Sequence, residues 1–378
     1  MLMLLIMNAC QNEQSQTTET AKAGPANATT KSDYYQEEHR PQFHFSPAAN
    51  WMNDPNGMVF YEGEYHLFYQ YYPDSTVWGP MHWGHAISKD MVHWEHLPIG
   101  LHPDELGYIF SGRAVVDWNN TSGFGKDGQP PLIAIFTYHE PKGAASDATD
   151  SQYQGIAYSN DKGRTWTKYE GNPVVPNVDK IKDFRDPKVV WDEDSKQWVM
   201  VFAAYDHLKF YGSPNLKDWN HLSDWGYEYG AHGGVWECPE LYPTIVEGTK
   251  EKKWGLIVSL NPGSPNGGSG TQYFVGDFDG KNFLIDPQFA LDVPKGKALW
   301  LDYGRDNYAG VTFSDIPKED GRRIFMGWMS NWDYAQVVPT EKWRSANTLP
   351  RQMILQKRPE GYRIVSQPVK ELEKLRGK

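Results

Sequence analysis

The chain alternates short apolar and aromatic runs with polar turn residues from Tyr34 onward. Residues 58–61 and 65–69 are two such runs, and a short Gly-containing turn separates them. Two strands joined in this way form a β-hairpin. The same arrangement returns at residues 188–202 and again at residues 241–258. The pattern therefore predicts a repeated antiparallel hairpin.

A second feature also repeats, in which a polar turn is followed after a few residues by a tryptophan, at Trp94, Trp166 and Trp219. Internal repeats of four-stranded units are typical of a β-propeller. Four or six units are alternative counts, and a β-sandwich or jelly roll is an alternative fold, but a sandwich would not explain the recurring hairpin. We predict an all-β, five-bladed β-propeller whose units begin near Asp54, Ser111, Asp186, Glu237 and Tyr308.

Three of these units begin with an acidic residue beside or near a proline, at Asp54, Asp186 and Glu237. Equivalent positions of successive blades surround one axis, so we expect the three acids to converge on a central pocket. Converging carboxylates raise one another's pKa, and proteins use them to bind a metal or for catalysis. Hard cations need six or more oxygen ligands, usually several from one loop. Acids that are dispersed and flanked by aromatic residues favour catalysis, and no metal is expected.

The amino-acid composition disfavours some classes of binding partner and of site. The net charge of −11 disfavours nucleic acid, which requires a basic footprint. Aromatic residues make up 14% of the chain, and flat rings with polar edges suit both a protein core and sugar binding. Only Cys10 and Cys238 are cysteines, so neither a disulfide framework nor a cysteine metal site is indicated. No cofactor is expected.

The N-terminal segment indicates export. Residues 1–10 hold an apolar run that is too short to span a bilayer and that ends at Cys10. This pattern resembles a bacterial lipoprotein signal, with a plain signal peptide as the alternative. Residues 11–33 are polar and of low complexity, which predicts a disordered tether. We therefore expect a secreted or surface protein of the outer membrane or periplasm, with a lipid anchor at Cys10 and no transmembrane span.

Three motifs carry a family resemblance. Residues 51–57 (WMNDPNG), 184–187 (FRDP) and 236–239 (WECP) resemble, in order, the signatures of glycoside hydrolase family 32, the invertases, inulinases and levanases. The resemblance implies retaining exo-hydrolysis of fructosyl linkages in fructans or sucrose. It implies that Asp54 is the nucleophile, that Glu237 is the general acid and base, and that Asp186 stabilises the transition state.

The resemblance also implies a set of fructose-binding residues. We expect Arg185 to keep its neighbour Asp186 ionised, and Cys238 to form part of the pocket wall rather than to act as a nucleophile. The substrate-binding positions implied are Asn53, Gln70, Trp78, Phe110, Ser111, Arg185, Tyr308 and Trp332.

Family members normally carry a β-sandwich after the propeller. We therefore expect the propeller to occupy residues 34–347, and residues 348–378 to form the linker and the start of a truncated sandwich region. Within that region, Val369, Leu372 and Leu375 have the spacing of one helical face.

Two other functions remain open on the sequence alone. One is a non-catalytic, fructan-binding propeller, which the presence of all three acids disfavours. The other is a fructosyltransferase, which shares the covalent intermediate. The extended loop at residues 78–83 resembles that of the fructan-degrading members of the family, and this resemblance favours a polymeric substrate over sucrose. The oligomeric state and the preferred linkage are left open.

Overall fold

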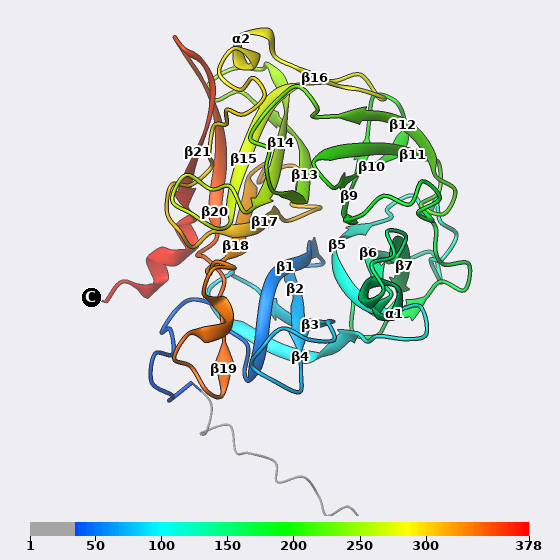
Figure 1. The fold of residues 1–378 in the computed structure, drawn as a ribbon, viewed down its shortest axis with the longest axis vertical. Helices are drawn as coiled ribbons and strands as arrows, with labels where there is room; N and C mark the ends of the chain where they lie inside the picture. The colour runs from blue at the N-terminus through cyan, green and yellow to red at the C-terminus, as the bar shows by residue number, and fades with distance from the viewer. Residues whose placement is uncertain (1–34, 378) are drawn as a thin grey trace, which may run out of the picture.

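Five β-sheets are arranged around one central axis in the computed structural model, which describes residues 35–377 (Figure 1). Each sheet is one blade, numbered 1 to 5 along the chain. Blade 1 consists of β1 (Asn50–Tyr61), β2 (Glu64–Tyr72), β3 (His82–Ser88) and β4 (Trp94–Leu101), and blade 2 of β5 (Tyr108–Val116), β6 (Leu132–His139), β7 (Gln152–Ser159) and β8 (Thr167–Lys168). Blade 3 consists of β9 (Phe184–Asp192), β10 (Gln197–Ala204), β11 (His207–Ser213) and β12 (Asn220–Trp225), and blade 4 of β13 (Val235–Ile245), β14 (Lys252–Asn261), β15 (Gly270–Phe278) and β16 (Phe283–Ile285). Blade 5 consists of β17 (Tyr308–Thr312), β18 (Arg323–Trp328), β20 (Arg351–Arg358) and β21 (Gly361–Pro368).

The first strand of each blade is its innermost strand. β1, β5, β9, β13 and β17 lie around the centre, and each contacts the next, with β17 returning to β1 (Figure 1). The five predicted unit starts each fall on one of these strands, so the predicted five-bladed propeller is confirmed. The predicted hairpins are also confirmed, as the antiparallel pairs β1–β2, β9–β10 and β13–β14.

Burial between the blades explains the apolar runs. In β6 every residue except His139 is buried, and in β10 every residue except Gln197. Because neighbouring blades cover both faces of such a strand, its sequence is a continuous run of apolar residues rather than an alternation of apolar and polar residues. Each fully buried Val, Leu, Ile or Phe side chain contributes about 1.5–3 kcal/mol. The interfaces between blades therefore supply most of the core.

The ring closes between blades 5 and 1. Residues 329–350, which we call the closing segment, leave β18 and cross to blade 1 before β20 begins. Within it, β19 (Trp343–Arg344) pairs in parallel with the start of β1. At the opposite end of β1, the Ser314 N–H donates to the Met58 carbonyl at 2.9 Å. Both ends of the innermost strand of blade 1 are thus fastened to blade 5.

The predicted boundary at residue 347 is wrong. β20 and β21 are the two outer strands of blade 5, in the order β17–β18–β20–β21, so the propeller continues to Pro368. The outer edge of β18 needs a hydrogen-bonded partner, and the chain supplies one only after the closing segment. All sheets within residues 35–377 belong to the five blades, and this part of the chain holds no strand of a β-sandwich.

Helices are short in the described part of the chain. They are α1 (Pro141–Ala145), α2 (Pro287–Ala290), the 3-10 turn η2 (Ala335–Val337) and the 3-10 helix η3 (Lys370–Leu375). The helical pattern predicted near the C-terminus corresponds to η3, where Val369 is buried but Leu375 is 43% exposed. None of the helices in residues 35–377 is long and apolar enough to cross a membrane. The predicted leader and tether, with Cys10, lie outside the described residues.

Candidate active site

Every innermost strand carries a β-bulge near its beginning, at the same end of the propeller. The pairing register shifts at residues 52–55 of β1, 109–112 of β5, 185–188 of β9, 237–240 of β13 and 308–311 of β17. A bulge interrupts the hydrogen-bond ladder and redirects side chains. Asp54, Ser111 and Asp186 lie inside their bulges, whereas Glu237 and Tyr308 immediately precede theirs. The five bulges therefore turn one side chain from each blade toward the axis.

The bulges also explain why prolines follow the acids. Pro187 and Pro239 lie inside bulges, where no ladder hydrogen bond requires the missing N–H. Asp186 and Cys238 have φ angles of 66° and 46°, a region that residues other than glycine rarely occupy. Backbone strain of this kind is concentrated at functional sites. In blade 2 the bulge requires a glycine, because a Cβ at Gly112 would overlap the Ile135 carbonyl.

Asp54 is held by hydrogen bonds to both of its carboxylate oxygens. Ser111 Oγ donates to Oδ2 at 2.6 Å, and Asn53 Nδ2 donates to Oδ1 at 3.0 Å. Asn53 is fixed in turn, because Trp51 Nε1 donates to its Oδ1 at 2.7 Å. Burial raises the pKa of Asp54 and the nearby Glu237 raises it further, whereas the bonds from Ser111 and Asn53 oppose the rise. These bonds orient the carboxylate and favour its ionised form.

Asp186 is buried, with 3% of its surface exposed. The Cys238 N–H donates to its Oδ2 at 2.9 Å, which links blades 3 and 4 at the axis. Burial raises the pKa of Asp186 to about 7; the charge of Arg185 lowers it, and Glu237 and Asp54 raise it. Arg185 lowers the pKa of Asp186, but burial and two neighbouring carboxylates raise this pKa by more. The prediction that Arg185 keeps Asp186 ionised is therefore wrong, because one guanidinium does not outweigh them.

Arg185 instead contacts Glu237 most closely. Its Nη2 donates to Glu237 Oε1 at 2.8 Å, whereas its Nε lies 3.8 Å from Asp186 Oδ2. Arg185 also forms an ion pair with Asp183. The second carboxylate oxygen of Glu237 accepts a hydrogen bond from the Tyr308 hydroxyl. Both oxygens of Glu237 thus have a fixed partner, one a cation and one a neutral hydroxyl.

The thiol of Cys238 lies between the carboxylates of Asp54 and Asp186. Its Sγ is 3.6 Å from both Asp54 Oδ2 and Asp186 Oδ2. Burial and the adjacent carboxylates raise the pKa of this thiol well above its usual value. A thiol that stays protonated is a poor nucleophile. Cys238 does not line the pocket that holds the three acids, so the prediction that it forms part of the pocket wall is wrong: it is buried behind the carboxylates that its thiol contacts.

One pocket of about 330 Å³ contains the three acids. Tyr308 is the one predicted site residue that does not line it: its ring is 1% exposed and lies behind Glu237. The residues that line the pocket are Asn53, Asp54, Gln70, Trp78, Phe110, Ser111, His139, Arg185, Asp186, Glu237, Trp332 and Gln336.

Two of these residues were missed in the sequence analysis. His139 ends β6 and stacks on Phe110, with ring centroids 4.3 Å apart. His139 pairs with Tyr108 ahead of the bulge, as Tyr72 pairs with Trp51 in blade 1, and Tyr72 does not line the pocket, so the repeat held no signal for His139. Gln336 belongs to the closing segment and accepts a hydrogen bond from the Trp78 N–H at 3.3 Å. No local sequence pattern predicts that Gln336 lies in the pocket, because its segment reaches the pocket only when the ring closes.

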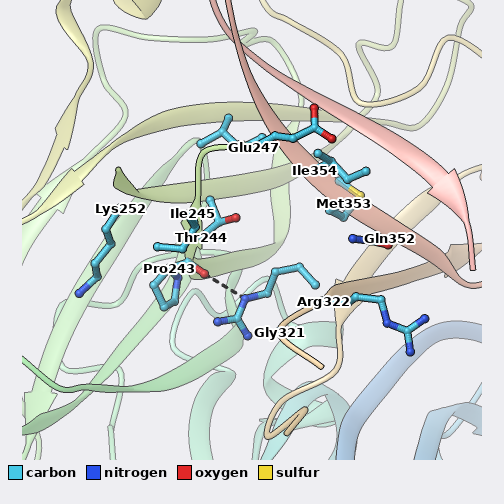
Figure 2. A pocket seen from close by; sticks show the side chains of 12 residues that line it. Pro243, Thr244, Ile245, Glu247, Lys252, Gly321, Arg322, Gln352, Met353 and Ile354 are labelled. Carbon is cyan, nitrogen blue, oxygen red and sulfur yellow. Dashed lines mark hydrogen bonds between the residues drawn. The ribbon is translucent and has the colours of Figure 1, made fainter. Parts of the chain in front are cut away.

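A second groove lies at the edge between blades 4 and 5 (Figure 2). Pro243, Thr244 and Ile245 of β13 form one wall, and residues 352–355 of β20 form the other. Its charged lining residues are one acid, Glu247, and three basic residues, Lys252, Arg322 and Arg323. A groove with a single carboxylate lacks the paired carboxyl groups of the axial pocket, and we place the candidate active site at the axis. Within residues 35–377, no cluster of three or more His, Cys, Asp and Glu residues is arranged to hold a metal ion.

The model of the glycosyl hydrolases family 32 N-terminal domain matches residues 44–368. The chain belongs to glycosyl hydrolase family 32. The match ends at the last residue of β21, in agreement with the corrected end of the propeller. It contains all three acids and every residue that lines their pocket.

Known members of the family are similar over most of this chain. The levanase of Bacillus subtilis is 59% identical over 347 residues, which are 92% of this chain and 49% of that protein. The extracellular exo-inulinase inuE of Aspergillus niger is 44% identical in an alignment of 371 positions that covers 93% of this chain and 68% of that protein. The crystal structure of exo-inulinase from Aspergillus awamori superposes with a TM-score of 0.80 at 42% identity, covering 88% of this chain and 68% of that one. The chain spans about half of the levanase and about two thirds of the exo-inulinases.

Proposed function

We propose that this protein is a retaining exo-β-fructofuranosidase that releases terminal fructosyl units from fructans and sucrose. The observation that carries the proposal is the pairing of Asp54 and Glu237 in one small pocket, where each carboxyl group has a different environment. Retaining glycosidases need two such carboxyl groups, one to attack and one to transfer a proton. The similarity to a levanase and to exo-inulinases supports fructans as the substrate class.

In the first step, the Asp54 carboxylate attacks the anomeric carbon of the fructosyl unit. The bond from that carbon to the leaving oxygen breaks, and protonated Glu237 gives its proton to this oxygen. The product is a fructosyl ester of Asp54. Asn53 and Ser111 hold the attacking carboxylate in place before the reaction, which reduces the reorganisation that the step requires.

In the second step, water replaces the leaving group. The Glu237 carboxylate takes a proton from this water, the water oxygen bonds to the anomeric carbon, and the ester bond to Asp54 breaks. Arg185 stabilises Glu237 while it is ionised between the two steps. Asp186, aimed into the same pocket, accepts hydrogen bonds from fructose hydroxyls and stabilises the positive charge that develops on the ring.

The shape of the pocket supports exo action. At about 330 Å³ it is near the small end of ligand pockets, and the rings of Trp78, Phe110 and Trp332 form part of its wall. Such a pocket holds the end of a chain rather than an internal segment. Export is part of the proposal and is supported by the extracellular exo-inulinases among the relatives. Anchoring at Cys10 stays a prediction from the sequence.

The test is fructose release from sucrose, inulin and levan by the purified chain, with products separated by chromatography. We expect free fructose as the sole product from both polymers. A ladder of oligosaccharides would contradict exo-hydrolysis and indicate endo action or transfer to sugar. No release by a correctly folded protein would support a fructan-binding propeller instead.

The covalent intermediate has its own test. The Glu237→Gln protein, given β-fructofuranosyl fluoride, should accumulate the ester because fluoride leaves without a proton and the second step lacks its base. Peptide mass spectrometry should then find one fructosyl unit on the peptide that contains Asp54. An unmodified peptide during steady turnover of the fluoride would contradict the retaining mechanism.

A further inference from the structure

A layer of three buried charged residues and one buried threonine lies beneath the pocket. It consists of Arg113 of β5, Lys188 of β9, Glu240 of β13 and Thr312 of β17, which we call the axial layer. The exposed fractions of these side chains are 0%, 3%, 0% and 1%. Each stands two to four positions after the side chain that the bulge of the same strand turns toward the axis: Ser111, Asp186, Glu237 and Tyr308.

Glu240 is the centre of this layer. Its Oε2 accepts a hydrogen bond from Arg113 Nε at 3.1 Å, and its Oε1 lies 2.7 Å from Lys188 Nζ. Thr312 Oγ1 donates to Oε1 at 2.5 Å. One carboxylate of blade 4 therefore binds side chains from blades 2, 3 and 5.

Burying the charges of the axial layer costs free energy, so stabilising the fold does not by itself account for the layer. Removing ionised groups from water costs several kcal/mol for each ion, and buried ion pairs often add little net stability over apolar residues of similar size. What they do provide is a fixed relative position of the groups that they join. The geometry of β13 shows which group depends on that position.

Glu240 stands just after the bulge that directs Glu237. The two residues of the bulge are Cys238 and Pro239, which lie between paired Glu237 and paired Glu240. Arg113 Nη2 also reaches the Pro239 carbonyl at 3.4 Å, so one guanidinium contacts both the bulge and Glu240. On the pocket side, the Cys238 N–H is bound by Asp186. The bulge is therefore fastened from both sides.

We propose that Glu240 is a positioning residue for the general acid: its carboxylate, bound to Arg113, Lys188 and Thr312, holds the Cys238–Pro239 bulge and thereby fixes the direction of the Glu237 side chain. Glu240 itself touches no substrate, because it is fully buried beneath the pocket and does not line it. The inference rests on the proposed role of Glu237 as proton donor.

The test compares two substrates that differ in their need for a proton. Sucrose releases a sugar oxygen that must be protonated, whereas β-fructofuranosyl fluoride releases fluoride without general acid help. kcat/KM reports the steps up to departure of the leaving group, so it isolates the step in which Glu237 donates. We define the selectivity of a variant as its fold loss of kcat/KM on sucrose divided by its fold loss on the fluoride.

Two variants test Glu240, and two serve as references. Glu240→Gln keeps the shape and removes the charge, while Thr312→Val removes one hydrogen bond and leaves the ion pairs intact, so it tests the proposal even if Glu240→Gln does not fold. Glu237→Gln removes the acid itself. Asp117→Asn is the matched control, because Asp117 is a buried acid that accepts hydrogen bonds from Thr121 and Ser122 of its own loop and bonds to no residue of β13.

We expect a selectivity of at least about 100 for Glu237→Gln, since general acid catalysis contributes 10²–10⁴-fold. Misplacing a catalytic group by about 1 Å costs on the order of 100-fold, so about tenfold is expected for Glu240→Gln and about threefold for Thr312→Val. Asp117→Asn should show a selectivity of one. Equal losses on both substrates for the Glu240 and Thr312 variants, with Glu237→Gln still selective, would overturn the positioning role. A Glu237→Gln protein without selectivity would instead refute the proposed function.

Discussion

The pocket and the axial layer are built from the same innermost strands, yet they treat charge in opposite ways. In the pocket, Asp186 and Glu237 share one cation, Arg185, and burial raises the pKa of both Asp54 and Asp186. In the axial layer, Glu240 is matched by two cations, and its pKa is lowered by Lys188 and Arg113 despite burial.

The difference shows how a propeller separates reactivity from rigidity. Burial with too little counter-charge raises the pKa of Asp186 to about 7, so this carboxyl group can gain and lose a proton near neutral pH. A carboxylate that is fully compensated stays ionised and acts as a fixed joint. Two to four positions along a strand separate one kind of site from the other.

The largest effect expected in the pocket comes from Asp54→Ala. Loss of the nucleophile should reduce kcat/KM on fructan by at least about 10⁴-fold, because no other group can form the ester. Ser111→Ala is the matched comparison: it removes one hydrogen bond to the same carboxylate and should cost about tenfold. Steady-state fructose release measures both. Activity of Asp54→Ala within tenfold of the parent would rule out its role.

The largest effect expected in the axial layer is on stability. Arg113→Met leaves the buried Glu240 with one cation instead of two, and breaking a buried ion pair costs about 3–5 kcal/mol. Urea unfolding followed by tryptophan fluorescence measures the change. Lys162→Met, which removes a surface ion pair with Glu62, should leave the midpoint unchanged. Equal midpoints for the two variants would show that the axial layer does not stabilise the fold.

A smaller effect, and one that depends on pH, is expected at Asp186. Its folded pKa of about 7 exceeds the unfolded value of about 3.9, so the folded protein binds more protons between these pH values. Stability from this group is present below about pH 4 and is lost as the pH rises toward 7. Asp186→Asn removes the loss, so its melting temperature relative to the parent should increase from pH 4 to pH 8.

Thermal unfolding of both proteins at pH 4, 6 and 8 measures this trend. Asp147→Asn, at an exposed position, is the control for a substitution of the same kind outside the pocket. A melting-temperature difference for Asp186→Asn that does not change with pH would contradict the raised pKa and its cause, burial among carboxylates.

The smallest effect is expected at the pocket rim. Gln336→Ala removes the acceptor for the Trp78 N–H and a polar group of the pocket wall, without touching the three acids. We expect KM for inulin to rise about threefold with little change in kcat, the signature of lost uniform binding. Gln356→Ala on β20, which lies outside the pocket, is the control. A fall in kcat with unchanged KM would place Gln336 in the chemistry rather than at the rim.

The acid–proline pairs show how far local patterns reach. Asp186 with Pro187, and Glu237 with Pro239, mark places where a strand begins and its ladder is broken, and both are properties of adjacent residues. The axial layer was also visible in principle. Arg113 and Lys188 are charged residues within otherwise apolar strands, but the bulges at Ser111 and Asp186 interrupt the alternation of side chains, so spacing alone does not assign them a side. Charged residues on an apolar strand were the signal, and the sequence analysis passed over it.

Other features depended on contacts between distant segments. Residues 351–368 belong to blade 5 because β20 pairs with β18, although the closing segment separates the two strands in sequence. No sequence pattern near residue 351 predicts this pairing. Gln336 reaches the pocket for the same reason. Arg185 stands next to Asp186 in sequence but binds Glu237, because the relative position of blades 3 and 4 decides which carboxylate its guanidinium meets.

By itself, the sequence determined the hairpin repeat, the five innermost strands and the convergence of three acids, because strand period, turn chemistry and repeat register act over a few residues. The tertiary structure alone decided where blade 5 ends, how the ring closes, which carboxylates receive counter-charge and what their pKa values become. Burial and Coulomb interactions depend on distances in space, and those distances are set only when all five blades meet at the axis.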